Sequence, residues 1–417
     1  MKNILVLTYY FEPDLSAGSF RNTALVKELS AQLGDQGKIH VITTQPNRYK
    51  SFRDAAKKYE EIGGNVRVHR IQVPPHSNGF KDQINSYRVY YQAAFSLIKN
   101  EKIDLVYASS SRLFTAYLGK VLSKRIGCPL YLDIRDIFVE TMVDVLRDRP
   151  IVKNFVIKFI EFFIERPTFR SAAHINMVSE GFRDYCAKIS KANFTFYPNG
   201  IDEEFIGIKR KDNADRKVTI TYAGNIGEGQ GLEKVVPQTA KLLGKGYLFK
   251  IIGDGGTKGL LQEKIREENL TNVELLDPVK RADLLEIYSN SDFLFLHLNN
   301  YKAFERVLPS KIFEYGATNL PMVAGVGGFA KEFIDRNVSN SFTFDPCDAN
   351  AFANWIQAYR YTLSNRIEFV ENFRRTTISK NLAASILSYL HISPQVITFG
   401  SEGYQRDDTK QLMIDGY

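Results

Sequence analysis

The sequence contains few cysteines and no long apolar stretch. Its three cysteines, Cys128, Cys186 and Cys347, lie far apart in the 417 residues and form no CxxC pair. Zinc sites and disulfide scaffolds need closely spaced cysteines, so neither is expected, and a reducing compartment such as the cytoplasm is. No window offers the roughly 20 apolar residues that a membrane-spanning helix needs. The short apolar run at the start soon meets a proline and two acidic residues, which favours a first strand over a secretory signal.

Metal-binding and dinucleotide signatures are missing as well. No DxD motif follows a predicted strand, and the six histidines are scattered, so no metal ion and no other cofactor is expected. The sequence has no GxGxxG fingerprint, which argues against a dinucleotide. The sequence contains 55 basic and 47 acidic residues, which gives a formal net charge of +8. This excess suits an anionic ligand or an anionic lipid, but it is too small and too spread to predict nucleic-acid binding.

The composition is that of a soluble globular protein, with 44% hydrophobic and 24% charged residues. At ~100–200 residues per domain, this length predicts two domains. Short apolar runs alternate with helix-like segments such as residues 21–32 and 86–99. The predicted strands cover residues 3–7, 38–43, 66–73, 104–108, 130–133, 175–178, 194–197, 218–222, 248–253, 273–275, 293–296, 322–324 and 341–344.

This alternation predicts an α/β fold with parallel sheets and right-handed crossovers. A polar stretch at residues 209–217 is interpreted as a linker. We expect a first Rossmann-like domain over residues 1–205, a second over 206–380, and a C-terminal helix with a polar tail over 381–417. Ligands of open parallel sheets bind beyond the carboxyl ends of the strands, so the two domains are expected to face each other across a ligand-binding cleft.

Loops rich in small residues follow predicted strands in both halves. A small-residue loop follows the first strand, and the segments AGNIGEGQG, GDGG and GVGG follow strands of the second half. The backbone N–H groups of such loops can wrap a phosphate beside a helix N-terminus, although each loop alone could be a plain turn. Several of them in one half predict a nucleotide site. The residues predicted to bind the nucleotide in these loops are Gly18, Gly224, Asn225, Gln230, Gly253 and Gly255.

The segment VLPSKIFEY predicts a helix that begins after Pro309 with Ser310 as its N-cap. A lysine in the first turn, here Lys311, is electrostatically unfavourable at a helix N-terminus, and a bound diphosphate would explain it. Glu314 lies one turn further along the same face and could accept hydrogen bonds from a ribose diol. The alternative is a surface Lys–Glu pair without a ligand.

Charged residues also stand at the end of a buried strand in the first half, in the segment LDIRD. Charges at such a place are costly unless they are paired or functional. Arg135 and Asp136 are therefore candidate catalytic residues, and an internal Arg–Asp pair is the structural alternative.

An apolar stripe with helical spacing runs through residues 152–163 and is surrounded by basic residues. Such a helix can lie in a membrane interface, although a stripe of this kind can equally belong to the core. We expect Phe155, Phe159, Phe163 and Lys158 to contact the inner face of the cell membrane or the acceptor. A second basic stretch, residues 48–58, could face phospholipid or a phosphorylated acceptor, or could be a solvated face.

The chain resembles glycosyltransferase family 4, which has the GT-B fold. The resemblance rests on the order of LTYYFEPDLSAGSFR, YPNGID, YAGNIGEGQGLE, IIGDGG, SDFLFLHL, LPSKIFEYGATNLPMVA and GVGGFAKEF. Among family members it is most similar to bacterial enzymes of O-antigen or capsular polysaccharide synthesis, including N-acetyl-L-fucosamine transferases. The resemblance implies a nucleotide-diphosphate sugar held by the second domain and an acceptor, lipid-linked or saccharide, held by the first. It also implies metal-independent transfer with retention at the anomeric carbon, and UDP as the expected nucleotide.

The resemblance assigns roles to single positions. It implies that Glu314 binds the donor ribose, and Val279 and Ser310 join the predicted donor-binding residues. Where relatives carry a glutamate eight residues before that position, this chain has Arg306, with Glu305 next to it. Relatives often have an arginine and a lysine in place of Asn225 and Gln230, and a histidine in place of Arg135. We therefore expect Lys311 to bind the diphosphate, and the predicted catalytic residues are Lys311, Glu305, Arg135 and Asp136.

Two other functions fit the same architecture. A non-hydrolysing sugar-nucleotide 2-epimerase would convert the donor without an acceptor, but it would need an acid/base pair beside the sugar, and no clear pair is visible. A binding protein without activity would release no free nucleotide.

Overall fold

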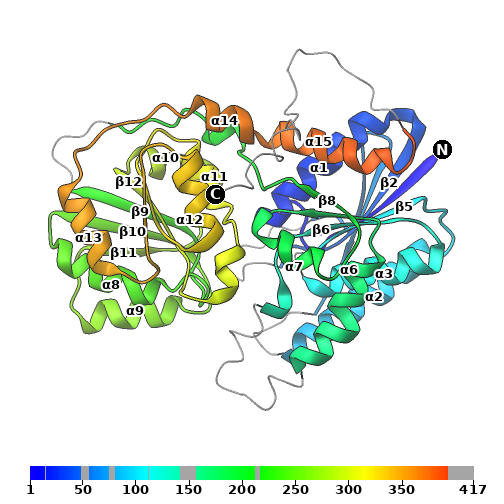
Figure 1. The fold of residues 1–417 in the computed structure, drawn as a ribbon, viewed down its shortest axis with the longest axis horizontal. Helices are drawn as coiled ribbons and strands as arrows, with labels where there is room; N and C mark the ends of the chain where they lie inside the picture. The colour runs from blue at the N-terminus through cyan, green and yellow to red at the C-terminus, as the bar shows by residue number, and fades with distance from the viewer. Residues whose placement is uncertain are drawn as a thin grey trace, which may run out of the picture.

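Two parallel sheets, one in each half of the chain, organise the structure (Figure 1). The computed structural model describes residues 1–14, 16–47, 56–74, 80–110, 112–140, 156–211 and 217–392. Each sheet carries helices on both faces, as expected of Rossmann-like α/β domains.

The first sheet has eight strands in the order β3-β4-β2-β1-β5-β6-β7-β8. All neighbours are parallel except β3, which pairs with β4 in antiparallel fashion. The central strands β5, β6 and β7 are buried along their whole length, which explains their runs of consecutive apolar residues. The strands are β1 (Lys2–Leu7), β2 (Gly37–Thr44), β3 (Tyr59–Ile62), β4 (Val66–Ile71), β5 (Leu105–Ser109), β6 (Leu130–Ile134), β7 (His174–Met177) and β8 (Asn193–Phe196).

The second sheet has six strands in the order β11-β10-β9-β12-β13-β14, and every pair is parallel. Its strand order reverses beside β9, so a ligand site is expected at the carboxyl ends of β9 and β12. The strands are β9 (Val218–Asn225), β10 (Tyr247–Asp254), β11 (Val273–Leu276), β12 (Phe293–His297), β13 (Met322–Gly325) and β14 (Ser341–Phe344).

Helices cover both faces of each sheet. In the first domain α2 and α3 pack on one face, and α1 and α15 pack on the other. In the second domain α8, α9 and α13 lie on one face, with α11, α12 and α14 on the other. The helices are α1 (Ala17–Leu33), α2 (Phe80–Ile98), α3 (Leu113–Ile126), α6 (Arg166–Ser171), α7 (Arg183–Ala187), α8 (Leu232–Leu243), α9 (Lys258–Glu267), α10 (Arg281–Ser289), α11 (Lys311–Gly316), α12 (Gly328–Asn337), α13 (Ala349–Ala358), α14 (Ile367–Phe373) and α15 (Arg375–Ser388).

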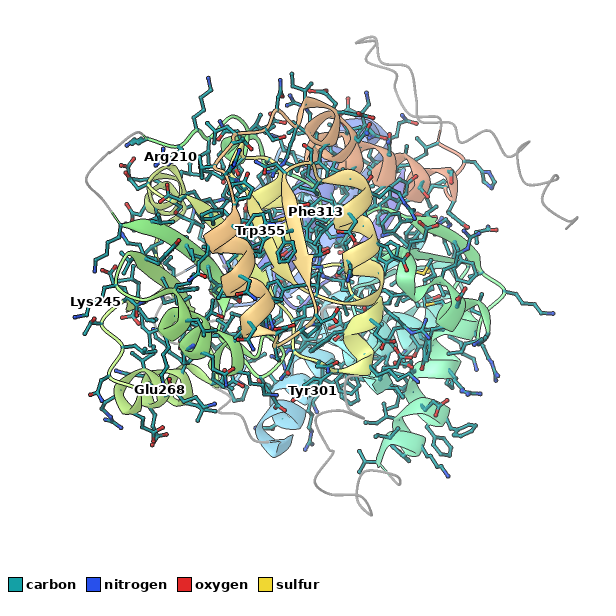
Figure 2. All side chains as sticks on the ribbon, turned by 60° about the vertical axis from the view of Figure 1, so that its left-hand side comes forward. Arg210, Lys245, Glu268, Tyr301, Phe313 and Trp355 are labelled. Atoms are coloured by element: carbon teal, nitrogen blue, oxygen red, sulfur yellow. The ribbon has the colours of Figure 1, made fainter. Side chains whose placement is uncertain are left out.

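Short helical turns complete the described chain. They are Gly34–Gln36, Glu180–Phe182, Glu203–Phe205 and Lys302–Arg306, all of the 3-10 type, and the π turn Glu161–Glu165. Figure 2 shows Phe313 of α11 inside the second domain, whereas Lys245 and Glu268 lie on its outer rim.

The chain crosses between the domains twice, and the two crossings lie side by side. Ile201 N–H donates to Phe373 O at 2.7 Å, and Arg375 N–H donates to Ile201 O at 2.8 Å. After this point α15 returns to the first domain and lies beside α1 (Figure 1). There Leu382 and Ile386 pack in the same core as Leu29 of α1. The C-terminal helix is therefore part of the packing of the first domain.

Every strand predicted from the sequence is present, and the bounds agree within about two residues except at the end of β9. The prediction missed β3, because its residues YEEI are mostly exposed and polar and give no apolar run. It also ended β9 too early: the strand continues to Asn225, so the glycine segment begins inside the sheet.

Candidate functional site

Two glycine segments of the second domain, AGNIGEGQG and GDGG, meet at the carboxyl ends of β9 and β10. Ile226 N–H donates to Asp254 O at 2.9 Å, which joins the two loops. Gly253 and Gly255 have φ of +148° and +157°, and a Cβ at either position would collide with the carbonyl of Gly224 or Ile226. Only glycine fits there, so these two residues are explained by close backbone packing that supports the loop after β9.

Two side chains, His297 at the end of β12 and Asn299 just after it, support the same loop. His297 Nδ1–H donates to Gln230 O at 2.6 Å, and Cys347 N–H donates to His297 Nε2 at 2.8 Å, which fixes one neutral tautomer. Burial lowers the pKa of His297 to about 4, so the ring stays neutral near pH 7. Asn299 Nδ2 donates to Glu228 O at 2.9 Å. Neither residue was predicted from the sequence, although His297 directly follows the predicted strand 293–296.

An aromatic residue also covers the loop. Tyr301, labelled in Figure 2, donates its hydroxyl hydrogen to Glu228 Oε1 at 2.7 Å. A Cβ on Gly229 would lie 3.0 Å from the ring of Phe304. The loop after β9 is therefore held by the segment between β12 and α11.

Lys311 and Glu314 lie at the edge of this loop. Lys311 Nζ donates to Glu314 Oε2 at 2.7 Å, and their side chains are 23% and 15% exposed. A Cβ on Gly224 would lie 3.4 Å from Lys311 Cε, so the lysine stem runs along the glycine backbone. Ala223 N–H donates to the Tyr315 hydroxyl at 3.1 Å, which ties α11 to β9. The Lys–Glu pair that the sequence left as an alternative is formed, and it is half-buried.

Helix α11 begins after Ser310 as predicted, but the Ser310 side chain does not cap it. Ser310 precedes α11, but its backbone is already helical (φ −61°, ψ −25°) and its side chain makes no capping hydrogen bond. A capping side chain needs an extended backbone at that position.

Asn225 and Gln230, both predicted to bind the nucleotide, are hydrogen-bonded to each other. Asn225 Nδ2 donates to Gln230 Oε1 at 2.6 Å. Val279 is partly buried against the core beneath α11.

In the first domain, the charge at the end of β6 is neutralised from α1. Arg21 Nε and Nη2 donate to both oxygens of Asp133 at 3.0 and 2.9 Å, and both residues are fully buried. Asn176 Nδ2 donates to the same carboxylate at 2.6 Å. The Arg–Asp pair therefore exists, but its arginine comes from the segment after the first strand instead of from LDIRD itself.

Arg135 is left with one unsatisfied nitrogen. Its Nη2 donates to Asn199 Oδ1 at 3.1 Å, while its buried Nη1 has no partner among the described residues. Burial lowers the pKa of Arg135 to about 10; Asp133 acts against this shift. The side chain of Asp136, next to it in the sequence, is exposed.

Gly18, predicted to bind the nucleotide, is buried in the first turn of α1. The N-cap residue of this helix, Ser16, accepts a hydrogen bond from Ser19 N–H at 3.1 Å.

Arg281 brings the two domains together near Lys311 and Glu314. Its guanidinium lies 4.4 Å from the ring centroid of Phe20 on α1 and forms ion pairs with Asp202 and Glu204. Burial acts to lower the pKa of Arg281, but Asp202, Glu204 and Glu314 raise it overall. Glu314 is therefore close to a contact between the carboxyl-end loops of both domains.

Glu305 and Arg306 lie in a 3-10 turn that reaches the first domain. The Glu305 side chain is exposed. Arg306 Nε lies 3.3 Å from Glu140 Oε2, and Ser179 Oγ donates to Arg306 O. The structure thus places Glu305 and Arg306 at the contact between the domains. Asp136 belongs to the first domain and Lys311 to the second.

The apolar stripe is divided between core and surface. Ile157 and Ile160 are buried, whereas Phe159 and Phe163 are 49% and 64% exposed. The π turn Glu161–Glu165 adds a residue to the helical turn and changes which side chains face the core. Lys158 is exposed beside them, and Phe155 lies outside the described residues.

The described residues contain neither a cluster of metal-binding side chains nor a helix suited to spanning a membrane. No three His, Cys, Asp or Glu side chains in the described ranges are placed to hold a metal ion. None of the helices in that part of the chain has the length and apolar character that crossing a bilayer requires.

Known families match both halves of the chain. Residues 23–200 match a family described as "Glycosyl transferase 4-like domain", and residues 205–376 match "Glycosyl transferases group 1". The chain is a group 1, GT4-like glycosyltransferase. The predicted enzyme class is thereby confirmed.

Relatives of this glycosyltransferase support the fold and its broad setting. A protein of Escherichia coli K12 described as a colanic acid biosynthesis glycosyl transferase, WcaI, is 25% identical over 345 residues, 77% of this chain and 81% of that protein. Sucrose-phosphate synthase from Thermosynechococcus elongatus has a TM-score of 0.71 at 15% identity and covers 94% of this chain and 100% of its own. Anabaena HepE, solved with UDP-glucose, has a TM-score of 0.57 at 14% identity and covers 94% and 97%. These structures confirm the predicted GT-B fold.

Proposed function

We propose that this glycosyltransferase moves a sugar, expected to be an N-acetylated amino sugar, from a UDP-sugar to a lipid-linked or saccharide acceptor in surface polysaccharide synthesis. Transfer proceeds with retention and without a metal ion. The observation that carries the proposal is the half-buried Lys311 beside the Gly224 backbone, at the carboxyl end of β9. The relation to WcaI supports polysaccharide synthesis, and HepE, solved with UDP-glucose, supports a UDP-sugar donor.

The chemistry requires charge stabilisation more than a protein base. When the bond between sugar and diphosphate breaks, negative charge grows on the leaving phosphate. Lys311 and the backbone N–H groups of the glycine loop supply positive charge at that point. In front-face transfer, the leaving phosphate oxygen takes the acceptor's proton, so both substrates mainly need correct placement. The first domain holds the acceptor near Arg135. The unsatisfied Nη1 of Arg135 supplies one further hydrogen-bond donor there.

The direct test is incubation of the enzyme with UDP-sugar, with and without a lipid-linked acceptor. Acceptor-dependent release of UDP and a glycosylated acceptor of retained anomeric configuration support the proposal. An epimerised sugar nucleotide formed without acceptor would instead establish the epimerase. Thermal-shift screening of UDP-, GDP- and dTDP-sugars identifies the nucleotide, because a ligand that binds the native state raises the melting temperature.

Glu314→Gln is expected to raise the Kd for UDP about tenfold, because a neutral amide replaces a charged acceptor for the ribose hydroxyls. Isothermal titration with UDP measures this. The matched control is Glu286→Gln, which changes another Lys–Glu pair, with Lys211, on an exposed face of α10. An unchanged Kd in Glu314→Gln would show that Glu314 does not bind the ribose.

The double substitution Phe159→Ser with Phe163→Ser is expected to lower binding to phosphatidylglycerol vesicles about tenfold, because both exposed rings can bury apolar area in the interface. Vesicle co-sedimentation measures the bound fraction. The control replaces two exposed leucines of the second domain, Leu242 and Leu260, by serine. Equal binding of the two double variants would exclude Phe159 and Phe163 as the contact.

A further inference from the structure

The residues Glu305–Val307 belong to the second domain but contact the first. Val307 packs against the apolar cores of both domains. Ser179 Oγ, in the segment after β7, donates to Arg306 O. Arg306 Nη1 donates to Gly181 O at 3.3 Å. The segment after β12 thus closes directly on the segment after β7.

Glycines on both sides make this contact tight. A Cβ on Gly181 would lie 2.6 Å from Arg306 O and 3.0 Å from Arg306 Cα, closer than real Cβ contacts. On the other side, Gly328 has φ of +53°, and a Cβ there would collide with Glu305 O. The backbone of Glu305 and Arg306 therefore lies between one glycine of each domain. The separation of the domains is set at this point, since packed interiors do not deform continuously.

An ion pair extends the contact toward β6. Arg306 Nε lies 3.3 Å from Glu140 Oε2, and the two side chains are 32% and 27% exposed. Glu140 follows the strand whose end carries Arg135 and Asp136. Helix α11 begins with Lys311. The Arg306–Glu140 pair therefore links the segment just before this helix to the segment that carries Arg135 and Asp136.

We infer that Arg306 is a positioning residue, a latch that fixes the first domain against the second at the distance that transfer requires. The inference rests on the proposed function, because only transfer between ligands held by different domains depends on this distance. It also explains the arginine at a position where a glutamate was expected from the resemblance. A carboxylate at position 306 would face the carboxylate of Glu140, and like charges at this distance repel.

A latch acts on turnover rather than on donor affinity. The reacting atoms must approach to about 3–3.5 Å, and a misplacement of about 1 Å can cost 10²-fold in rate. The donor-binding groups Lys311, Glu314 and Gly224 all lie in the second domain, so the latch should not affect the affinity for UDP.

The first experiment is a charge-reversal cycle. Arg306→Ala and Glu140→Ala are each expected to lower kcat for transfer by 10- to 100-fold, with the Kd for UDP within twofold of the parent. Arg306→Glu with Glu140→Arg is expected to recover kcat to within about fivefold of the parent. If Arg306→Ala instead raises the Kd for UDP-sugar tenfold at unchanged kcat, Arg306 contacts the donor and the latch is refuted. A double variant no better than its single variants refutes the ion pair.

The second experiment needs no activity, so it separates failure of the latch from failure of the proposed function. Gly181→Ala places a methyl group against Arg306 without changing any charge. Hydrogen exchange of the ligand-free enzyme is expected to increase at least tenfold at residues 179–182 and 302–308. The control is Gly259→Ala in α9, where a Cβ has open space. Exchange in Gly181→Ala that equals the control at both segments overturns the inference, even if transfer activity is observed.

Discussion

Replacing Lys311 by alanine is expected to lower kcat by about 10²- to 10³-fold, the range observed when one donor to a developing oxyanion is removed. The Lys311 side chain lies against the Gly224 backbone, where the proposal places the diphosphate. Stability should change little, because Lys311 and Glu314 form a half-buried pair within one helical turn. Steady-state kinetics with a saturating donor, together with a melting curve, measures both effects.

The control for this prediction is Lys241→Ala. Lys241 also pairs with a glutamate, Glu268, but it lies in the last turn of α8, at the opposite end of the sheet. Its kcat should equal that of the parent. Near-normal turnover of Lys311→Ala would remove the lysine from the diphosphate site.

Asp133→Ala is expected to destabilise the first domain by ~3–5 kcal/mol, because it leaves the fully buried Arg21 guanidinium without its carboxylate. Burial alone would raise the pKa of Asp133, but Arg21 and Arg135 hold it below the ordinary value. A lowered carboxyl pKa stabilises the fold above about pH 4 and loses that contribution as the pH falls further. The parent should therefore lose stability in acid more steeply than the variant.

Urea denaturation followed by circular dichroism measures this effect. Asp277→Ala, which removes the carboxylate of an exposed pair with Lys258, serves as the control and should denature like the parent. Arg21→Met combined with Asp133→Leu should recover much of the loss, because apolar side chains of similar volume can replace a buried ion pair. A midpoint for Asp133→Ala equal to that of the control would contradict the prediction.

The strands were predictable because burial on both faces leaves a direct trace in the sequence. Residues 105–109 of β5 are all buried, and they read as an apolar run. The strand β3 left no such trace, because three of its four residues are exposed. The same local reasoning placed Lys311 and the glycine loop correctly on the carboxyl edge of the second sheet.

The contacts that complete the candidate site could not be predicted in this way. Arg21 and Asp133 are 112 residues apart, and their pairing depends on the neighbouring positions of α1 and β6 in the fold. Arg306 and Glu140 meet only because two domains pack together. Sequence patterns report the periodicity of one element, whereas these pairs depend on tertiary structure. The roles assigned to Lys311, Glu314, Arg135 and Asp136 remain predictions.

The return of α15 to the first domain has a consequence for synthesis on the ribosome. The core that contains Leu25 and Leu29 of α1 also contains Leu382, Ala383 and Ile386. All described strands and helices of the second domain have been made once residue 373 has emerged, but the first domain must wait for α15 before it can bury that surface. The domain that is translated first is therefore the one that finishes folding last.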